Sequence, residues 1–263
     1  MRPPAHVLQA FGADGVGEQL PGGRGNAWRF GDVILKPLDV LPDELEWLRQ
    51  VMSGSAERAD IRVSTPLASD SGRLVVDGWI AFPRLEGAHR PGSWHEIAGV
   101  ARVLSDVFVG VERPAFLDLR THAWARADRI AWGEEPDADI AGAPFVADLL
   151  AARRAVSDPA GIIHGDLTGN VLFDDSAAPA VIDFTAYWRP VQYSIAIIAV
   201  DVACFEGAPL SLLQTIDASN QFAQHLLRAL VFRIATDWLN HADGAHFAVY
   251  ESVTARVLEL AQA

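Results

Sequence analysis

Lysine, cysteine and long apolar segments are all scarce in this sequence. Cys204 is the single cysteine among 263 residues, so no intramolecular disulfide can form, which favours a reducing compartment. The longest apolar run, residues 195–205, is interrupted by Asp201 and is too short to span a membrane. The first residues carry Arg2 but no apolar signal core. We therefore expect a cytoplasmic protein without a membrane anchor.

Positive charge is also in short supply. The chain has 34 acidic and 21 basic residues, and its formal net charge of −13 argues against nucleic acid as a partner, because binding a phosphate backbone needs clustered Lys and Arg. Such a field would attract a cationic ligand, although many acidic cytosolic proteins carry a similar one. Half of the residues are apolar, enough to bury a substantial core. These values fit a compact enzyme and leave its oligomeric state open.

Short apolar segments that are typical of buried strands flank three polar side chains, Asp166, Asn170 and Asp183. A carboxylate such as Asp166 can accept the proton of an attacking hydroxyl, and Asn170 and Asp183 offer the hard oxygen ligands that Mg²⁺ prefers. Alternatively, Asp166 and Asp183 are turn and strand-end carboxylates without a ligand. We favour magnesium-dependent phosphoryl transfer. The strands are expected over residues 161–163, 171–173 and 180–182.

The stretch from His164-Gly165-Asp166 to Ile182-Asp183-Phe184 resembles the catalytic loop and metal-binding strand of aminoglycoside phosphotransferases and choline kinase-like enzymes, distant relatives of the protein kinases. In that pattern, His-x-Asp is followed by an Asn and then by Ile-Asp-Phe or Ile-Asp-Trp. The resemblance implies that Asp166 is the catalytic base, that Asn170 and Asp183 bind Mg²⁺, and that ATP is the phosphate donor. It also implies a structural role for His164.

The sequence departs from the family pattern at two places. Asn170 lies four residues after Asp166 instead of the usual five, and we expect Gly169 to absorb the difference through a backbone conformation closed to other residues. The family also carries an Asp that braces the catalytic loop in a Tyr-Asp-Leu-Ala-like sequence, where this chain has Ser194. Asp201, two helical turns along the same face, is the candidate for the missing acceptor.

Lys36 is the only lysine beside 20 arginines, and it lies in the apolar run 32–37. A strand lysine contacts the α- and β-phosphates in kinase-like folds, and the resemblance assigns this role to Lys36. Because Arg stands almost everywhere else, a retained Lys indicates a position where ammonium and guanidinium are not interchangeable. Alternatively, Lys36 lies on an exposed strand and was retained by chance.

A glycine-rich segment precedes the strand that leads into the lysine strand. Gly22, Gly23, Gly25 and Asn26 would let backbone N–H groups approach phosphate oxygens closely, as in the loose glycine loop of small-molecule kinases. The same residues also make an ordinary hairpin turn. Their position before Lys36 favours the nucleotide-binding role.

Residues 42–52 are predicted to form a helix, because Pro42 and acidic residues stand in its first turn and apolar residues follow at helical spacing. Glu44 lies on the apolar face, whereas Glu46 points away, so Glu44 is the expected partner of Lys36. Alternatively, Glu44 is a first-turn acid that the helix dipole favours.

A bent strand or hairpin over residues 73–82 leads into Pro83-Arg84-Leu85-Glu86-Gly87, which looks like the hinge between two kinase lobes. The resemblance implies that the carbonyl of Pro83 accepts from the adenine amine and that the N–H of Leu85 donates to the ring. Proline is tolerable at the first position because only its carbonyl is needed.

Residues 185–190 follow Asp183 directly and include Tyr187, Trp188 and Arg189. These side chains either face the γ-phosphate or the acceptor, or they pack the segment onto the helical part of the protein. We favour packing for Tyr187 and Trp188.

The rest of the chain has apolar residues at helical spacing. We predict an α+β, bilobal, protein-kinase-like fold with a small β-rich N-terminal nucleotide-binding lobe, residues 1–86, and a larger helical catalytic and acceptor-binding lobe, residues 87–263. The nucleotide is expected in the cleft between them. Helices are expected over residues 93–108, 121–132, 144–156, 191–205, 210–240 and 245–260.

The predicted function is that of an ATP- and Mg²⁺-dependent phosphotransferase that modifies a hydroxyl of a small molecule, aminoglycoside-like or other. A nucleotide-binding pseudokinase with a sensing or scaffolding role is the alternative, which the short loop and Ser194 suggest. A protein kinase fits less well, because no Ala-Pro-Glu segment follows Asp183 and Pro190 stands only seven positions after it.

Overall fold

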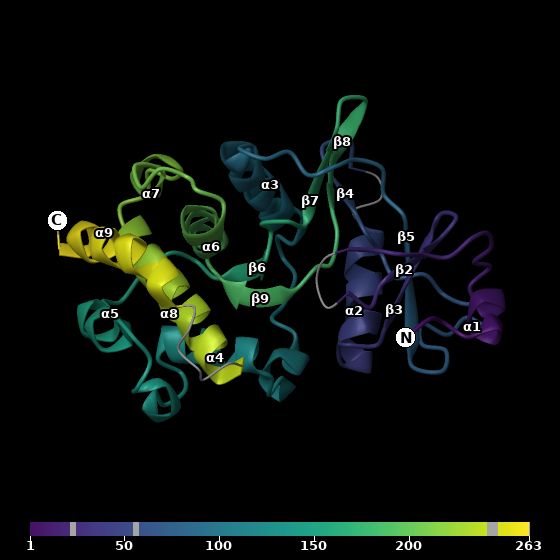
Figure 1. Ribbon diagram of the computed structural model, residues 1–263, viewed down its shortest axis with the longest axis horizontal. Coiled ribbons are helices and arrows are strands. Elements are labelled where there is room, and N and C mark those ends of the chain that lie inside the picture. The colour runs from purple at the N-terminus through teal and green to yellow at the C-terminus, as the bar shows by residue number, and fades with distance from the viewer. Residues whose placement is uncertain (22–24, 55–57, 241–246, 263) are drawn as a thin grey trace. The chain divides into compact units, whose positions relative to one another are not determined.

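A computed structural model gives the fold of the chain (Figure 1) and describes residues 1–21, 25–54, 58–240 and 247–262. The chain divides into two compact units. Unit 1 comprises Met1–His89 and Asn170–Phe184, and unit 2 comprises Arg90–Gly169 and Thr185–Ala263. Residues 170–184 therefore pack with the N-terminal residues. The functional division into lobes 1–86 and 87–263 stays a prediction.

Unit 1 contains helices and two small sheets. Its elements are α1 (Ala5–Ala10), β1 (Glu18–Gln19), β2 (Trp28–Phe30), β3 (Val33–Pro37), α2 (Pro42–Ser53), β4 (Arg62–Val63), β5 (Trp79–Pro83), β7 (Val171–Asp174) and β8 (Ala177–Val181). One sheet has the order β1-β2-β3-β5 with antiparallel neighbours. In the other, β8 pairs antiparallel with β7 and parallel with β4.

The alternation of side chains along β3 gives the larger sheet two different faces. Leu35 is fully buried in a cluster with Trp79 and other apolar residues. Lys36 points to the opposite face and pairs in register with Ile80 of β5. Ile80 packs against Leu45 of α2. Helix α2 therefore covers the face of the sheet that carries Lys36.

Unit 2 is mostly helical. Its elements are α3 (Trp94–Val107), the 3₁₀ turn Ala115–Leu119, α4 (Ala123–Trp132), the 3₁₀ turn Ala138–Ile140, α5 (Val146–Ala152), β6 (Gly161–His164), β9 (Ala186–Arg189), α6 (Val191–Phe205), α7 (Leu212–Thr215), α8 (Phe222–Asn240), the 3₁₀ turn Phe247–Tyr250 and α9 (Glu251–Gln262). The strands β6 and β9 form an antiparallel pair in which Ile163 lies opposite Tyr187.

Helices α6 and α8 form the centre of unit 2. Helix α8 packs against α4 and α6, and α3 packs against α6 and β6 (Figure 1). Most of α6 is buried, including every residue from Tyr193 to Val202. Despite this apolar character, none of the helices in the described ranges has the length and hydropathy needed to cross a membrane.

The expected helix over residues 210–240 is interrupted. The structure ends α7 at Thr215 and begins α8 at Phe222. Between them, the N–H of Ser219 donates to the carboxylate of Asp217 at 2.8 Å, and Arg102 of α3 pairs with the same carboxylate. An Asp side chain that bonds to the backbone two residues on offers an alternative to helical hydrogen bonds.

Candidate active site

The two predicted metal ligands lie beside each other at one end of the β7–β8 hairpin. Val171 pairs with Val181, so Asn170 just before β7 and Asp183 just after β8 come to the same end. The N–H of Ile182 donates to the carbonyl of Asn170 at 3.0 Å. Asp183 has a φ of +49°, a left-handed conformation that is uncommon outside glycine and clusters at functional sites.

Lys36 joins this pair from β3. Its Nζ lies 2.6 Å from Oδ1 of Asp183 and 3.3 Å from Oδ1 of Asp39. Burial lowers the pKa of the ammonium, but the carboxylates of Asp183 and Asp39 outweigh it, so the pKa lies above its ordinary value. Unit 1 thus brings Lys36, Asn170 and Asp183 together.

The expected pair between Lys36 and Glu44 is not formed. In the described ranges, the carboxylates in contact with Lys36 are Asp39 and Asp183. Glu44 does lie on the apolar face of α2 and is buried there. Asp39 takes the place of Glu44 because it follows Lys36 by three residues in the loop before α2. A role for Glu44 in nucleotide binding stays a prediction.

The predicted glycine loop lies between β1 and β2. Gly22 and Gly23 fall outside the described residues. Gly25 has a φ of +62°, with no described atom near the position of a Cβ, so its conformation and not a lack of space favours glycine. Asn26 follows in the same connection. The flanking strands β1 and β2 pair antiparallel, and phosphate binding by these residues stays a prediction.

The predicted adenine-binding residues stand at the end of β5. Pro83 is the last residue of that strand and pairs with Val33. The N–H of Arg84 donates to the carbonyl of Asp32 at 2.8 Å, and Leu85 follows outside regular secondary structure. Both candidate positions are partly exposed. Their contacts with adenine stay predictions.

The predicted base, Asp166, lies in unit 2, in the loop after β6. Its N–H donates to Nδ1 of the buried His164 at 3.0 Å, which agrees with a structural role for this histidine. The N–H of Gly165 donates to the carbonyl of Thr185 at 3.0 Å. A Cβ at Gly165 would meet the ring of Tyr187, so only glycine fits between the loop and β9.

At both places where the sequence departs from the family pattern, a nearby residue accommodates the change. Gly169 has a φ of +83°, the left-handed conformation expected at the shortened loop. The hydroxyl of Ser194 is buried and donates to the carbonyl of His164 at 2.7 Å. The serine therefore braces the end of β6 as a donor.

Arg233 of α8 contacts the predicted base, and the sequence interpretation did not include it. Its Nη2 donates to Oδ1 of Asp166 at 2.8 Å, and its Nε donates to Oδ1 of the buried Asp201 at 2.7 Å. Asp201 therefore reaches the loop through Arg233. The signal was present, because Asp201 and Arg233 each interrupt an apolar run, and a charge among apolar residues needs a partner.

A cavity of about 320 Å³ in unit 2 has Asp166 in its wall. Its size is that of a small-molecule site. The hydroxyl of Tyr250 donates to Oδ2 of Asp237 at 2.7 Å, and the ring of Tyr250 meets the ring of Phe205 edge to face. The lining residues are Trp124, Asp166, Thr168, Asp201, Phe205, Arg233, Thr236, Asp237, Asn240 and Tyr250.

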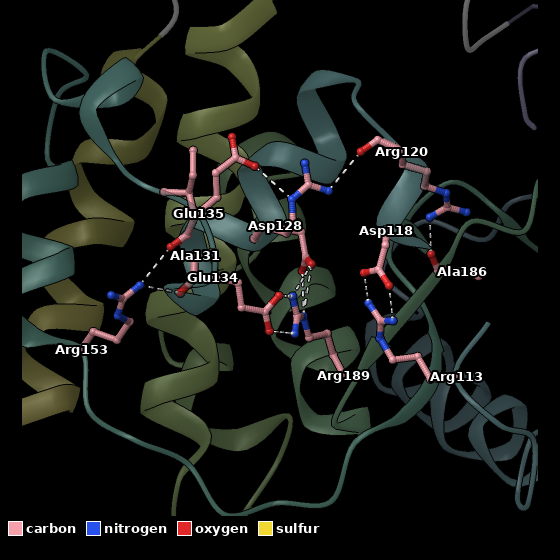
Figure 2. Close-up of polar contacts among 12 residues, drawn as sticks. Arg113, Asp118, Arg120, Asp128, Ala131, Glu134, Glu135, Arg153, Ala186 and Arg189 are labelled. Atoms are coloured by element: carbon pink, nitrogen blue, oxygen red, sulfur yellow. Dashed lines mark hydrogen bonds and ion pairs between the residues drawn. The ribbon is translucent and has the colours of Figure 1, made fainter. Parts of the chain in front are cut away.

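Of the aromatic residues that follow Asp183, Tyr187 packs inside unit 2, as predicted. Tyr187 is buried, with its ring against Phe232 of α8. Arg189 points toward Asp128 and Glu134 and binds both, at distances down to 2.7 and 2.6 Å (Figure 2). These contacts attach β9 to α4 and to the residues that follow it.

The model of the phosphotransferase enzyme family matches residues 18–230 of this chain, well over half of its length. The chain belongs to this family. Membership agrees with the resemblance drawn from the residues around Asp166 and Asp183, and it identifies the fold as protein-kinase-like, as predicted.

Solved structures share the fold of this phosphotransferase. A microcompartment-associated aminopropanol kinase is 18% identical, with a TM-score of 0.61, and 98% of this chain and 96% of that chain are covered. Amicoumacin kinase in complex with AMP-PNP and Ca²⁺ is 12% identical, with a TM-score of 0.60 and coverage of 97% and 92%. A choline/ethanolamine kinase family protein from Mesorhizobium loti is 17% identical, with a TM-score of 0.56 and coverage of 96% and 90%. No curated protein matches the sequence.

The donor set of this phosphotransferase fits a magnesium ion. Asn170 and Asp183 offer an amide oxygen and a carboxylate, and Mg²⁺ is usually held by one or two such ligands together with substrate phosphates and water. Within the described ranges, no group of three or more His, Cys, Asp and Glu could hold a metal ion. The pair beside Lys36 therefore suits a metal that arrives with a nucleotide.

Proposed function

We propose that this protein is an ATP-dependent phosphotransferase that transfers the γ-phosphate to a hydroxyl of a small molecule. The observation that carries the proposal is the meeting of Lys36 with Asp183, beside Asn170, at one end of the β7–β8 hairpin. An ammonium, a carboxylate and an amide are the groups that a metal-bound triphosphate requires.

On the nucleotide side, Lys36 would hold the α- and β-phosphates. Backbone groups of the loop with Gly25 and Asn26 would approach the phosphate oxygens, and Pro83 and Leu85 would contact adenine. Asn170 and Asp183 would hold Mg²⁺, which neutralises charge on the phosphates when it is bound. Residues 1–86 would thus supply the nucleotide contacts and residues 87–263 the metal ligands, the base and the acceptor contacts.

On the acceptor side, Asp166 would orient the hydroxyl and accept its proton. A positioned base contributes about 10²–10⁴-fold, or roughly 3–5.5 kcal/mol of barrier. The cavity beside Asp166 supports an acceptor of small-molecule size. The wall carries three carboxylates, Asp166, Asp201 and Asp237, against one guanidinium, that of Arg233. This excess of negative charge, together with the aromatic rings, favours an acceptor that carries positive charge, as aminoglycosides do.

Two measurements on the wild-type protein test the proposal. The first is the shift of Tm with ATP, in the presence and absence of Mg²⁺, and we expect Mg²⁺ to increase it. The second is transfer of label from γ-labelled ATP to amino sugars, macrolides, amino alcohols and sugars. A labelled acceptor is the expected result. Binding of ATP without transfer to any of these classes would favour the nucleotide-binding pseudokinase.

A further inference from the structure

Arg233 links the loop that carries Asp166 to the buried part of α6. Its guanidinium lies between two carboxylates, since Nε and Nη2 donate to Asp201 and Nη2 also donates to Oδ1 of Asp166 at 2.8 Å. The side chains of Arg233 and Asp201 are 11% and 7% exposed, whereas that of Asp166 is 51% exposed. All three side chains line the cavity, and the link runs from a buried carboxylate to a half-exposed one.

The buried end fixes the orientation of the guanidinium. Two of its nitrogens bind both oxygens of Asp201, a fork-like geometry that specifies direction as well as distance. Its carbon also lies 5.0 Å from the centre of the Phe232 ring. Arg stays protonated at any working pH, and its planar group has no freedom to turn once both carboxylate oxygens are bound. The N–H that reaches Asp166 is thus aimed by α6 and α8.

We propose that Arg233 is a positioning residue that holds the carboxylate of Asp166 in its proton-accepting orientation, an inference that rests on the proposed function. Ser194 and His164 hold the backbone of this loop, through the carbonyl of His164 and the N–H of Asp166. Arg233 acts on the side chain. Because the carboxylate of Asp166 is half-exposed, the side chains that bind it decide its rotamer, and a displacement of about 1 Å at a reacting group can cost about 10²-fold in rate.

The first test compares kcat and KM of Arg233→Met and Arg233→Lys with those of the wild type. Arg233→Met is expected to lower kcat about 10- to 100-fold and to leave KM for MgATP within about two-fold. Arg233→Lys keeps a cationic N–H donor but lacks the planar, two-point geometry of the guanidinium, so its kcat should lie between those of Arg233→Met and the wild type. Arg189→Met is the matched control, because Arg189 is equally buried between two acids elsewhere in unit 2. An equal fall of kcat in both Met variants would overturn the proposal.

Arg233→Met by itself would leave the buried carboxylate of Asp201 without its partner, and a second test removes that charge as well. The double variant Arg233→Met/Asp201→Asn has neither member of the pair and should fold, and it should show the same loss of kcat. In protein that already carries Asp166→Asn, Arg233→Met should have no further effect on kcat, because no carboxylate base remains to be positioned. A further 10-fold loss in that background would contradict the positioning role.

A third measurement needs no acceptor. The effects of Arg233→Met and Asp166→Asn on Tm should be non-additive, because the two side chains are in direct contact. Additive shifts would overturn the inference even in an inactive protein. If the wild type transfers no phosphate, the proposed function fails. If transfer occurs and Asp166→Asn abolishes it while Arg233→Met does not affect it, only the inference on Arg233 fails.

Discussion

Two arginine clusters in unit 2 have the same construction and different surroundings. Arg233 is 11% exposed and binds Asp201, which is 7% exposed, and Asp166, which is 51% exposed.

Arg189 is also 11% exposed, and it binds Asp128, which is 7% exposed, and Glu134, which is 49% exposed (Figure 2). Burial and pairing are therefore the same in both clusters. The clusters differ in the element that carries the half-exposed acid, which we call the outer acid. Asp166 follows β6 in the loop that leads to the predicted metal ligands, whereas Glu134 follows α4.

The largest expected difference between the clusters is in the outer acids. Asp166→Asn should lower kcat about 10²–10⁴-fold, because an amide cannot accept the proton of the acceptor hydroxyl. Glu134→Gln makes the same chemical change on the other arginine and should leave kcat within about two-fold. Steady-state kinetics of both variants, with ATP affinity as the control for folding, would measure the difference. Comparable losses in the two variants would end the distinction between the clusters.

Substitutions of the two buried acids, Asp201 and Asp128, should have similar effects on stability and different effects on kcat. Asp201→Asn and Asp128→Asn each remove one charge of a buried pair, and breaking such a pair costs about 3–5 kcal/mol. Urea denaturation should therefore show similar losses in the free energy of unfolding. Only Asp201→Asn should also lower kcat, because Arg233 loses the carboxylate that aims it. Unchanged kcat in folded Asp201→Asn protein would refute this part of the account.

The smallest expected effect concerns Tyr187, which lies near both clusters. Its ring packs against Phe232, the neighbour of Arg233, and Arg120 lies over it at 5.8 Å. Burial, followed by Asp128, raises the pKa of the Tyr187 hydroxyl, so it stays neutral. In the described part of the chain, this hydroxyl has no hydrogen-bond partner.

Tyr187→Phe should therefore change the free energy of unfolding by less than about 1 kcal/mol and leave kcat unchanged. Chemical denaturation and steady-state kinetics would measure both quantities. A large loss of turnover in this variant, comparable to that expected for Arg233→Met, would mean that the hydroxyl connects the two clusters, which the account does not allow.

The sequence predicted those parts of the site that depend on local pattern. Short apolar segments around Asn170 and Asp183 indicated the strands β7 and β8, and antiparallel pairing then brings the two ligands to one end. Lys36 was predicted as a site residue because it is the only lysine in the sequence. The face of α2 that buries Glu44 was also predicted, because helical spacing decides it.

Contacts between distant segments could not be predicted in the same way. The partner of Lys36 depends on the path of the loop with Asp39, which periodicity does not specify. The pair of Asp201 with Arg233 depends on how α6 and α8 pack, since 32 residues separate them. The interruption near Asp217 depends on one side-chain hydrogen bond and on Arg102 from α3.

The most direct test of the central claim is a calorimetric titration of ATP with and without Mg²⁺, using wild type, Asp183→Asn and Lys36→Ala. We expect Mg²⁺ to tighten ATP binding to the wild type, Asp183→Asn to lose this increment, and Lys36→Ala to weaken binding under both conditions. An equal Mg²⁺ increment in the wild type and Asp183→Asn, or undiminished affinity in Lys36→Ala, would contradict it.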